Sequence, residues 1–147
     1  MADLWIERTV TARRTLVVAA RTTWPEFPTL WRPLLDEVWQ CLRAAGVRGG
    51  CPNVMLYLDD APQVEIGVLA AEPVPLTGRV VRSTLPAGAV ATTRHRGPYA
   101  GLGETHETVR NWAADHGRRL AGPRWEIYGP HRDDPAEQWV EVGYLMA

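Results

Sequence analysis

One predicted strand, Trp125-Glu126-Ile127-Tyr128, combines an acidic residue with aromatic side chains. Side chains alternate between the two faces of a strand, so Glu126 and Tyr128 share one face while Trp125 and Ile127 share the other. A carboxylate among aromatic rings attracts lipophilic cations, both through its charge and through cation–π contacts with the rings. The strand therefore predicts an acidic floor to an aromatic cavity. The alternative is an exposed strand face on which Glu126 is solvated.

Two further glutamates stand at equivalent positions of similar segments, Val64-Glu65-Ile66-Gly67 and Val140-Glu141-Val142-Gly143. If Glu65 or Glu141 faces the same cavity as Glu126, it supplies a second carboxylate. Two carboxylates in different environments can divide the roles of acid and base. The alternative is a solvated face on which each glutamate pairs with arginine. The spacing does not fix a distance, so both interpretations stay open.

Three of the seven tryptophans fall on predicted helices. An aromatic side chain on a helix more often packs in the core than contacts a ligand, because a large apolar area favours burial. Trp39 lies off the main apolar stripe of its helix, and Trp112 lies beside the stripe of the other. These two are therefore better candidates than Trp31 for lining a cavity.

The residue types disfavour several other chemistries. The chain has no lysine, which excludes Schiff-base chemistry and the P-loop lysine. Its one serine, Ser83, lacks a Gly-x-Ser-x-Gly elbow, so a serine hydrolase is disfavoured. Cys41 and Cys51 do not form a Cys-x-x-Cys pair, and we expect reduced thiols. The histidines show no metal-ligand spacing and are interpreted as ordinary surface or core residues: His95, His106, His116 and His131. We expect no metal site and no cofactor.

Length and composition set the broad class. A chain of 147 residues suits one domain or two small, closely packed halves. Its 46% apolar and 22% charged residues are typical of a soluble globular protein. The net charge of −1 and the pI near 6.4 disfavour direct nucleic-acid binding by phosphate neutralisation. No apolar run reaches about 18 residues and the N-terminus has no signal-peptide pattern, so we expect a cytoplasmic protein without a membrane segment.

The candidate residues are positioned by an order of elements that occurs twice. The first β-α-β-β cycle begins with a β-like stretch at 5–21 and a helix at about 30–45 that ends at Gly46. Two strands follow, at 53–58 and 64–71. A helix that starts near Leu30 places Pro33 in its first turn, which leaves its start open. The second cycle begins with a β-like stretch at 79–96, bent at 86–88, and a helix at 99–116 that ends at Gly117. Two strands follow, at 124–128 and 139–146.

The repeat is also visible in the letters. Val64–Leu69 matches Val140–Leu145 at most positions, and Tyr57 and Tyr128 each end the preceding strand. We therefore predict an α+β fold in two layers, built from duplicated β-α-β-β units with pseudo-two-fold symmetry. The chain, 1–147, is expected to form a single domain with half-repeats at about 1–75 and 76–147. Ligands favour concave sites at such junctions, so a ligand groove is expected between the halves.

The second half carries a series of short motifs: His95-Arg96-Gly97-Pro98-Tyr99-Ala100-Gly101-Leu102, Trp112, Gly117, Gly122-Pro123 and Glu126-Ile127-Tyr128-Gly129-Pro130. Each motif is weak alone, but together they resemble the GyrI-like small-molecule-binding domain. This is also the effector-binding domain of many AraC-type and multidrug-responsive MerR-type regulators. The motifs cover about residues 80–147, and the duplication extends the resemblance to the whole chain.

The resemblance implies a pocket for bulky, often cationic aromatic compounds. It assigns Glu126 as the buried glutamate of the family, with Tyr128 beside it. Tyr99 corresponds to the Gly-Pro-Tyr tyrosine and Trp112 to the helix tryptophan. Tyr57 and Tyr144 are carried over by repeat position and strand placement only. No helix-turn-helix or winged-helix segment is attached, so we expect a stand-alone member, and no haem-specific signal is present.

Stand-alone members of the family suggest three functions. The first is a binding protein for lipophilic aromatic, often cationic, small molecules. Its expected ligand-binding residues are Glu126, Tyr128, Trp112, Tyr99, Tyr144, Tyr57 and Trp39. The second is a cofactor-free hydrolase that opens cyclopropane rings of alkylating natural products, so enzymatic activity stays open. Its catalytic candidates are Glu126 as base, Tyr128 or Tyr99 as proton donor, and Glu141 as an outside candidate. The third is a gyrase-inhibitor-like protein-interaction role. We expect a monomer or weak homodimer.

Overall fold

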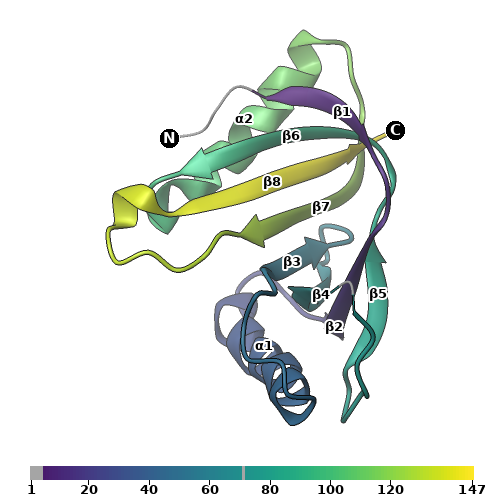
Figure 1. Cartoon of the computed structure of the whole chain (residues 1–147). Coiled ribbons are helices and arrows are strands. Elements are labelled where there is room, and N and C mark those ends of the chain that lie inside the picture. The colour runs from purple at the N-terminus through teal and green to yellow at the C-terminus, as the bar shows by residue number, and fades with distance from the viewer. Residues whose placement is uncertain (1–4, 71) are drawn as a thin grey trace. The chain divides into compact units, whose positions relative to one another are not determined.

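Eight strands and two α-helices follow one another in this computed structural model, which describes residues 5–70 and 72–147 (Figure 1). The first cycle comprises β1 (Ile6–Val10), β2 (Arg13–Arg21), α1 (Phe27–Ala44), β3 (Asn53–Tyr57) and β4 (Gln63–Leu69). The second comprises β5 (Val81–Leu85), β6 (Gly88–Arg96), α2 (Leu102–Asp115), β7 (Leu120–Tyr128) and β8 (Trp139–Met146). Short 3-10 turns at Tyr99–Gly101 and Pro135–Glu137 precede α2 and β8. The predicted α+β class is confirmed. Ala71, the expected end of one strand, lies outside the described residues.

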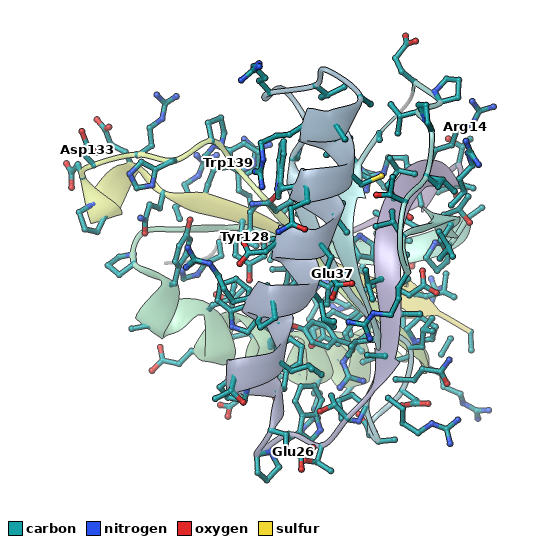
Figure 2. The ribbon with its side chains drawn as sticks, turned by 90° about the horizontal axis from the view of Figure 1, so that it is seen from below. Arg14, Glu26, Glu37, Tyr128, Asp133 and Trp139 are labelled. Atoms are coloured by element: carbon teal, nitrogen blue, oxygen red, sulfur yellow. The ribbon has the colours of Figure 1, made fainter. Side chains whose placement is uncertain are left out.

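Helix α1 begins at Phe27, earlier than the start near Leu30 that the sequence suggested. Pro28 lies in the first turn, where the missing N–H removes no hydrogen bond of the helix. Pro33 therefore falls inside the helix, beyond the first turn. The predicted stop is confirmed, because Gly46 adopts φ 83° and the N–H of Val47 donates to the carbonyl of Leu42. Figure 2 labels Glu26 at the start of this helix.

The chain divides into two compact units. The central unit is Ala12–Leu85, and the terminal unit joins the segment through Thr11 to Pro86–Ala147. The strand order is β5-β2-β4-β3 in the central unit and β1-β6-β8-β7 in the terminal unit, with the pairs described antiparallel. Each β-like stretch of the sequence thus forms two strands, one for each unit. The expected half-repeats, about 1–75 and 76–147, differ from the compact units by this exchange of β1 and β5.

The register makes positions in the two units equivalent. In the central unit Met55 pairs with Ile66 and Tyr57 pairs with Val64. In the terminal unit Glu126 pairs with Val142 and Tyr128 pairs with Val140. Met55 therefore occupies the position of Glu126, as Tyr57 does that of Tyr128.

Helix α2 covers one face of the terminal sheet. A cluster of buried side chains joins the helix to this face: Trp5, Ala91, Leu102, Val109, Val140, Val142 and Met146. Directly paired residues on neighbouring strands share a face, so Glu126, which pairs with Val142, points to the side of the sheet that α2 covers. This packing places a glutamate on the core side of the terminal unit.

Candidate functional site

Glu126 is buried in the terminal unit, with a relative exposure of 5%. Its neighbours Trp125 and Ile127, on the other face of β7, are 1% and 4% exposed. The strand is therefore covered on both faces, and the alternative of a solvated Glu126 on an open face is wrong. A buried carboxylate is stable only where hydrogen-bond donors meet its charge.

Donors from β7 and from α2 meet the carboxylate. The hydroxyl of Tyr128 donates to Oε1 of Glu126 at 2.9 Å, as the shared strand face allows. His106 approaches Oε2 with its Nε2 at 2.6 Å, from helix α2. The other ring nitrogen of His106, Nδ1, lies 2.5 Å from the hydroxyl of Tyr144 on β8. We call Glu126, Tyr128, His106 and Tyr144 the Glu126 cluster.

The described hydrogen bonds of the Glu126 cluster are compatible with a neutral imidazole. In this tautomer Nε2–H of His106 donates to the carboxylate, and the hydroxyl of Tyr144 donates to Nδ1. Burial, followed by the negative charge of Glu126, raises the pKa of Tyr128 well above that of free tyrosine. Tyr128 therefore remains a protonated donor. In this state the cluster carries one net negative charge.

Aromatic rings contact two members of the cluster in the terminal unit. Tyr99, on the 3-10 turn before α2, is 43% exposed and meets Tyr128 edge-on, with ring centroids 5.7 Å apart. Trp5 meets Tyr144 in the same manner at 5.9 Å. Trp112 packs against the core of this unit and stacks on His116, with centroids 4.6 Å apart. The described contacts thus join Tyr99 to the cluster directly, while Trp112 contacts its own helix.

Glu141 does not belong to the Glu126 cluster. It pairs with Arg94 on β6 and Ile127 on β7, and so lies on the face of the sheet opposite to Glu126. Glu65 holds the equivalent position in the central unit, opposite Leu56. Its Oε1 is buried without a hydrogen-bond partner among the described residues. Neither glutamate shares the face of its sheet that corresponds to that of Glu126.

The remaining predicted ligand residues lie in the central unit. Tyr57 donates from its hydroxyl to the Met55 sulfur at 3.6 Å and packs against Trp24 and Phe27, with centroids 5.6 and 5.4 Å apart. Trp39 donates from its indole N–H to Asn53 at 2.8 Å. Within the described residues, no three His, Cys, Asp or Glu side chains are arranged to hold a metal ion. Across the same residues, no helix is long and apolar enough to cross a membrane.

A family model named for the GyrI-like small molecule binding domain matches residues 6–142. The chain belongs to the GyrI-like family. Among curated protein sequences, none matches it significantly.

Solved structures support the GyrI-like fold. The C-terminal domain of EcmrR is 18% identical with a TM-score of 0.77, over 98% of this chain and 97% of that one. In an EcmrR–DNA complex the identity is 19% and the TM-score 0.75, over 97% of this chain and 57% of EcmrR. SAV2435 bound to tetraphenylphosphonium is 10% identical with a TM-score of 0.68, over 99% and 94% of the two chains. A hydrolase from Listeria innocua is 13% identical with a TM-score of 0.64, over 97% and 91%.

One member of the cluster, His106, was missed by the interpretation of the histidines as ordinary residues. The available signal is its place in the α2 stripe, between buried Leu102 and Val109. A histidine inside an apolar stripe must find a polar partner in the core. In this GyrI-like domain the partners are Glu126 and Tyr144, which come from strands far along the chain.

The central unit shows what the same positions contain without the cluster. Met55 replaces Glu126 in the register, and Val68 replaces Tyr144 in the repeated strand. Leu35 lies as many residues before Gly46, which ends α1, as His106 lies before Gly117, which ends α2. Leu35 therefore occupies the position of His106 in the central unit. Met55, Leu35 and Val68 are all buried and apolar. One unit of this GyrI-like domain is thus polar where the other is hydrophobic.

Proposed function

We propose that this GyrI-like domain binds lipophilic aromatic cations, with Glu126 as the charge that selects them. The observation that carries the proposal is the contrast between the two units. A unit of this fold accommodates Met55, Leu35 and Val68, so Glu126, His106 and Tyr144 are not needed to build it. Burying a carboxylate is unfavourable, and a buried charge that the fold does not need is a candidate for function.

The surroundings of Glu126 suit such ligands. A cation near the cluster gains attraction from the net negative charge and from the faces of Tyr128, Tyr99 and Tyr144. Trp112 extends the proposed aromatic surface along α2. The structure of SAV2435, which contains tetraphenylphosphonium, supports a ligand of this class in the same fold. The roles expected for Tyr57 and Trp39 stay predictions.

Titration with tetraphenylphosphonium tests the proposal through quenching of tryptophan fluorescence. We expect Glu126→Gln to weaken binding by about tenfold or more, because a charge-assisted interaction contributes about 1.5–3 kcal/mol. Tetraphenylborate has the same shape and the opposite charge, and its binding should not weaken. Glu141→Gln removes the same charge from the opposite face of the sheet and is the matched control. Equal affinities of wild type and Glu126→Gln for the cation would exclude Glu126 as the selecting charge.

The cofactor-free hydrolase is the second candidate, favoured by the acid–base groups gathered around Glu126. In a cyclopropane fused to a quinonoid ring, the oxygen of water bonds to a cyclopropane carbon as a carbon–carbon bond breaks. The released electron pair generates a phenolate, which takes up a proton. Glu126 is the proposed base for the water, and Tyr128 or Tyr99 the proton donor. A hydrolase from Listeria innocua has the same fold.

Mass spectrometry for a water adduct separates the two candidates. A hydrolase should add water to such a compound faster than buffer does, and Glu126→Gln should slow that step by about 10²–10⁴-fold. Binding without faster water addition would restrict the protein to sequestration. The protein-partner role stays a prediction, which a pull-down of a topoisomerase from a lysate would test.

A further inference from the structure

His106 lies between an acid and a hydroxyl in the terminal unit. Its side chain is 20% exposed, and its nitrogens lie 2.6 Å from Glu126 Oε2 and 2.5 Å from the Tyr144 hydroxyl. The sequence assigned it no role, and the central unit has Leu35 in its place. The proposed cation site uses the charge of Glu126, and His106 is a titratable group within hydrogen-bond distance of that charge.

We propose that His106 makes the site exchange a proton for a lipophilic cation, so that ligand binding expels the proton from the imidazole. The inference rests on the proposed function, because it concerns the same site. With a neutral imidazole the Glu126 cluster carries one net negative charge. With an imidazolium, that charge is compensated at hydrogen-bond distance. A bound cation and a protonated His106 therefore compete for Glu126.

The hydrogen bonds of the cluster accommodate both charge states without moving heavy atoms. A tyrosine hydroxyl can donate or accept, so Tyr144 donates to Nδ1 of the neutral ring and accepts from Nδ1–H of the charged ring. Glu126 accepts from Nε2–H in both states. Tyr128 continues to donate to Oε1, because its raised pKa keeps it protonated. Proton uptake at His106 thus leaves each of these bonds in place.

Other titratable and charged groups face His106 from the elements around it. On β7, Arg124 shares the face of Glu126 and remains positive in either state, while its side chain donates to the carbonyl of Gly122. On α2, the neighbour one turn away is the exposed Arg110. On β6, His95 is buried.

Both ring nitrogens of His95 contact uncharged groups. Nε2 of His95 donates to the carbonyl of Pro98, and Nδ1 lies 2.8 Å from the hydroxyl of Thr105. His95 is therefore satisfied by neutral groups, whereas His106 contacts a carboxylate. This difference identifies His106 as the ring whose protonation competes with a cation.

The experiment is calorimetric titration of the full chain with tetraphenylphosphonium, between about pH 5 and about pH 8, where histidines change charge. Two buffers of different ionisation enthalpy report the number of protons released. For wild type we expect proton release, and an affinity that rises with pH by up to about tenfold per pH unit. Tetraphenylborate should release no proton.

Two variants assign the proton. His106→Gln keeps an N–H group for Glu126 but cannot titrate, so it should bind the cation with little proton release and a flat pH profile. His131→Gln is the matched control, because His131 is 82% exposed and pairs with Asp133 in the β7–β8 connection. It should behave as wild type.

The outcomes separate the inference from the proposed function. If His106→Gln releases as many protons as wild type while Glu126→Gln still weakens binding, the exchange is overturned and the cation site stands. If tetraphenylphosphonium binds independently of Glu126, the cation site itself falls. Should His106→Gln fail to fold, NMR of the His106 ring in wild type decides. Saturating cation should shift the midpoint of its titration to lower pH, and an unchanged midpoint overturns the proposal.

Discussion

Tyr128 and His106 donate to different oxygens of the Glu126 carboxylate, so each donor can be removed separately. Tyr128 comes from the same strand as Glu126, while His106 arrives from the helix above it. The position of Tyr128 beside Glu126 follows from strand geometry alone. The position of His106 depends on how α2 packs against the sheet.

Tyr128→Phe should lower the free energy of unfolding by about 1.5–3 kcal/mol at neutral pH, because a buried carboxylate loses a donor. The raised pKa of Tyr128 adds a pH dependence. The unfolded tyrosine ionises near pH 10 while the folded one stays protonated, so wild type loses stability as pH rises above about 10. Urea unfolding at several alkaline pH values should show that the difference in free energy of unfolding between wild type and Tyr128→Phe becomes smaller as the pH rises.

Tyr99→Phe is the control for this series, since Tyr99 is 43% exposed and contacts Tyr128 through its ring. Its unfolding curve should follow wild type at every pH. A gap between wild type and Tyr128→Phe that stays constant up to strongly alkaline pH would contradict the assigned role of the hydroxyl.

The sequence indicates only part of the cluster. Glu126 and Tyr128 could be placed on one face from the two-residue period of a strand. His106 could not, because a single histidine in an apolar stripe is compatible with many core partners. The strand register was also needed to exclude Glu141 from the Glu126 cluster, because the pairing of neighbouring strands decides which residues share a face.

Gly67 and Gly143, which lie inside the two Val-Glu-x-Gly strands, are required there for steric reasons. A Cβ at Gly67 would lie 1.8 Å from the carbonyl oxygen of Leu16, on the neighbouring strand β2. A Cβ at Gly143 would lie 2.6 Å from the indole of Trp125, which is 1% exposed. The repeated glycine thus allows close approach of a backbone in one unit and of a tryptophan in the other.

Gly143→Ala should therefore destabilise the protein by about 1–3 kcal/mol, the usual range for overpacking. Gly67→Ala should cost more, because backbone atoms yield less than a side chain. Gly103 on α2 is the control, since a Cβ there meets nothing within 4 Å. Gly103→Ala should stabilise the helix by about 0.5–1 kcal/mol. Urea unfolding of the three variants measures the free energy of unfolding of each. If Gly67→Ala leaves that free energy unchanged, the close packing at Gly67 is contradicted.

The strands and helices were largely predictable, because periodicity and glycine stops are local signals. The exchange of edge strands was not. The stretches 5–21 and 79–96 each read as one β-like segment, yet each forms two strands that belong to different units. Pairing partners are chosen by long-range contacts, such as Ile6 with Thr92, which a local pattern does not contain.

The N-terminal segment belongs to the unit formed by the C-terminal half, and Trp5 shows how it is held. Trp5 is 7% exposed in the core of the terminal unit, and its indole N–H donates to Thr108 at 2.6 Å. Trp5→Ala should cost about 3–5 kcal/mol. Hydrogen exchange should accelerate first in β6, β8 and α2, which share its unit.

Leu42→Ala is the reciprocal change, because Leu42 is 1% exposed in the central unit. It should accelerate exchange first in α1, β3 and β4. Equal acceleration of both units by either variant would show that they open together.

The apolar positions of the central unit imply a trade-off between stability and ligand recognition. Because the β-α-β-β motif occurs twice, one unit can keep a hydrophobic core while the other carries charge. Replacing Glu126, His106 and Tyr144 by the Met, Leu and Val of the central unit should yield a protein about 1–4 kcal/mol more stable. That protein should no longer bind tetraphenylphosphonium. The difference in free energy of unfolding between this triple variant and wild type would measure the stability that the domain loses by carrying the proposed cation site.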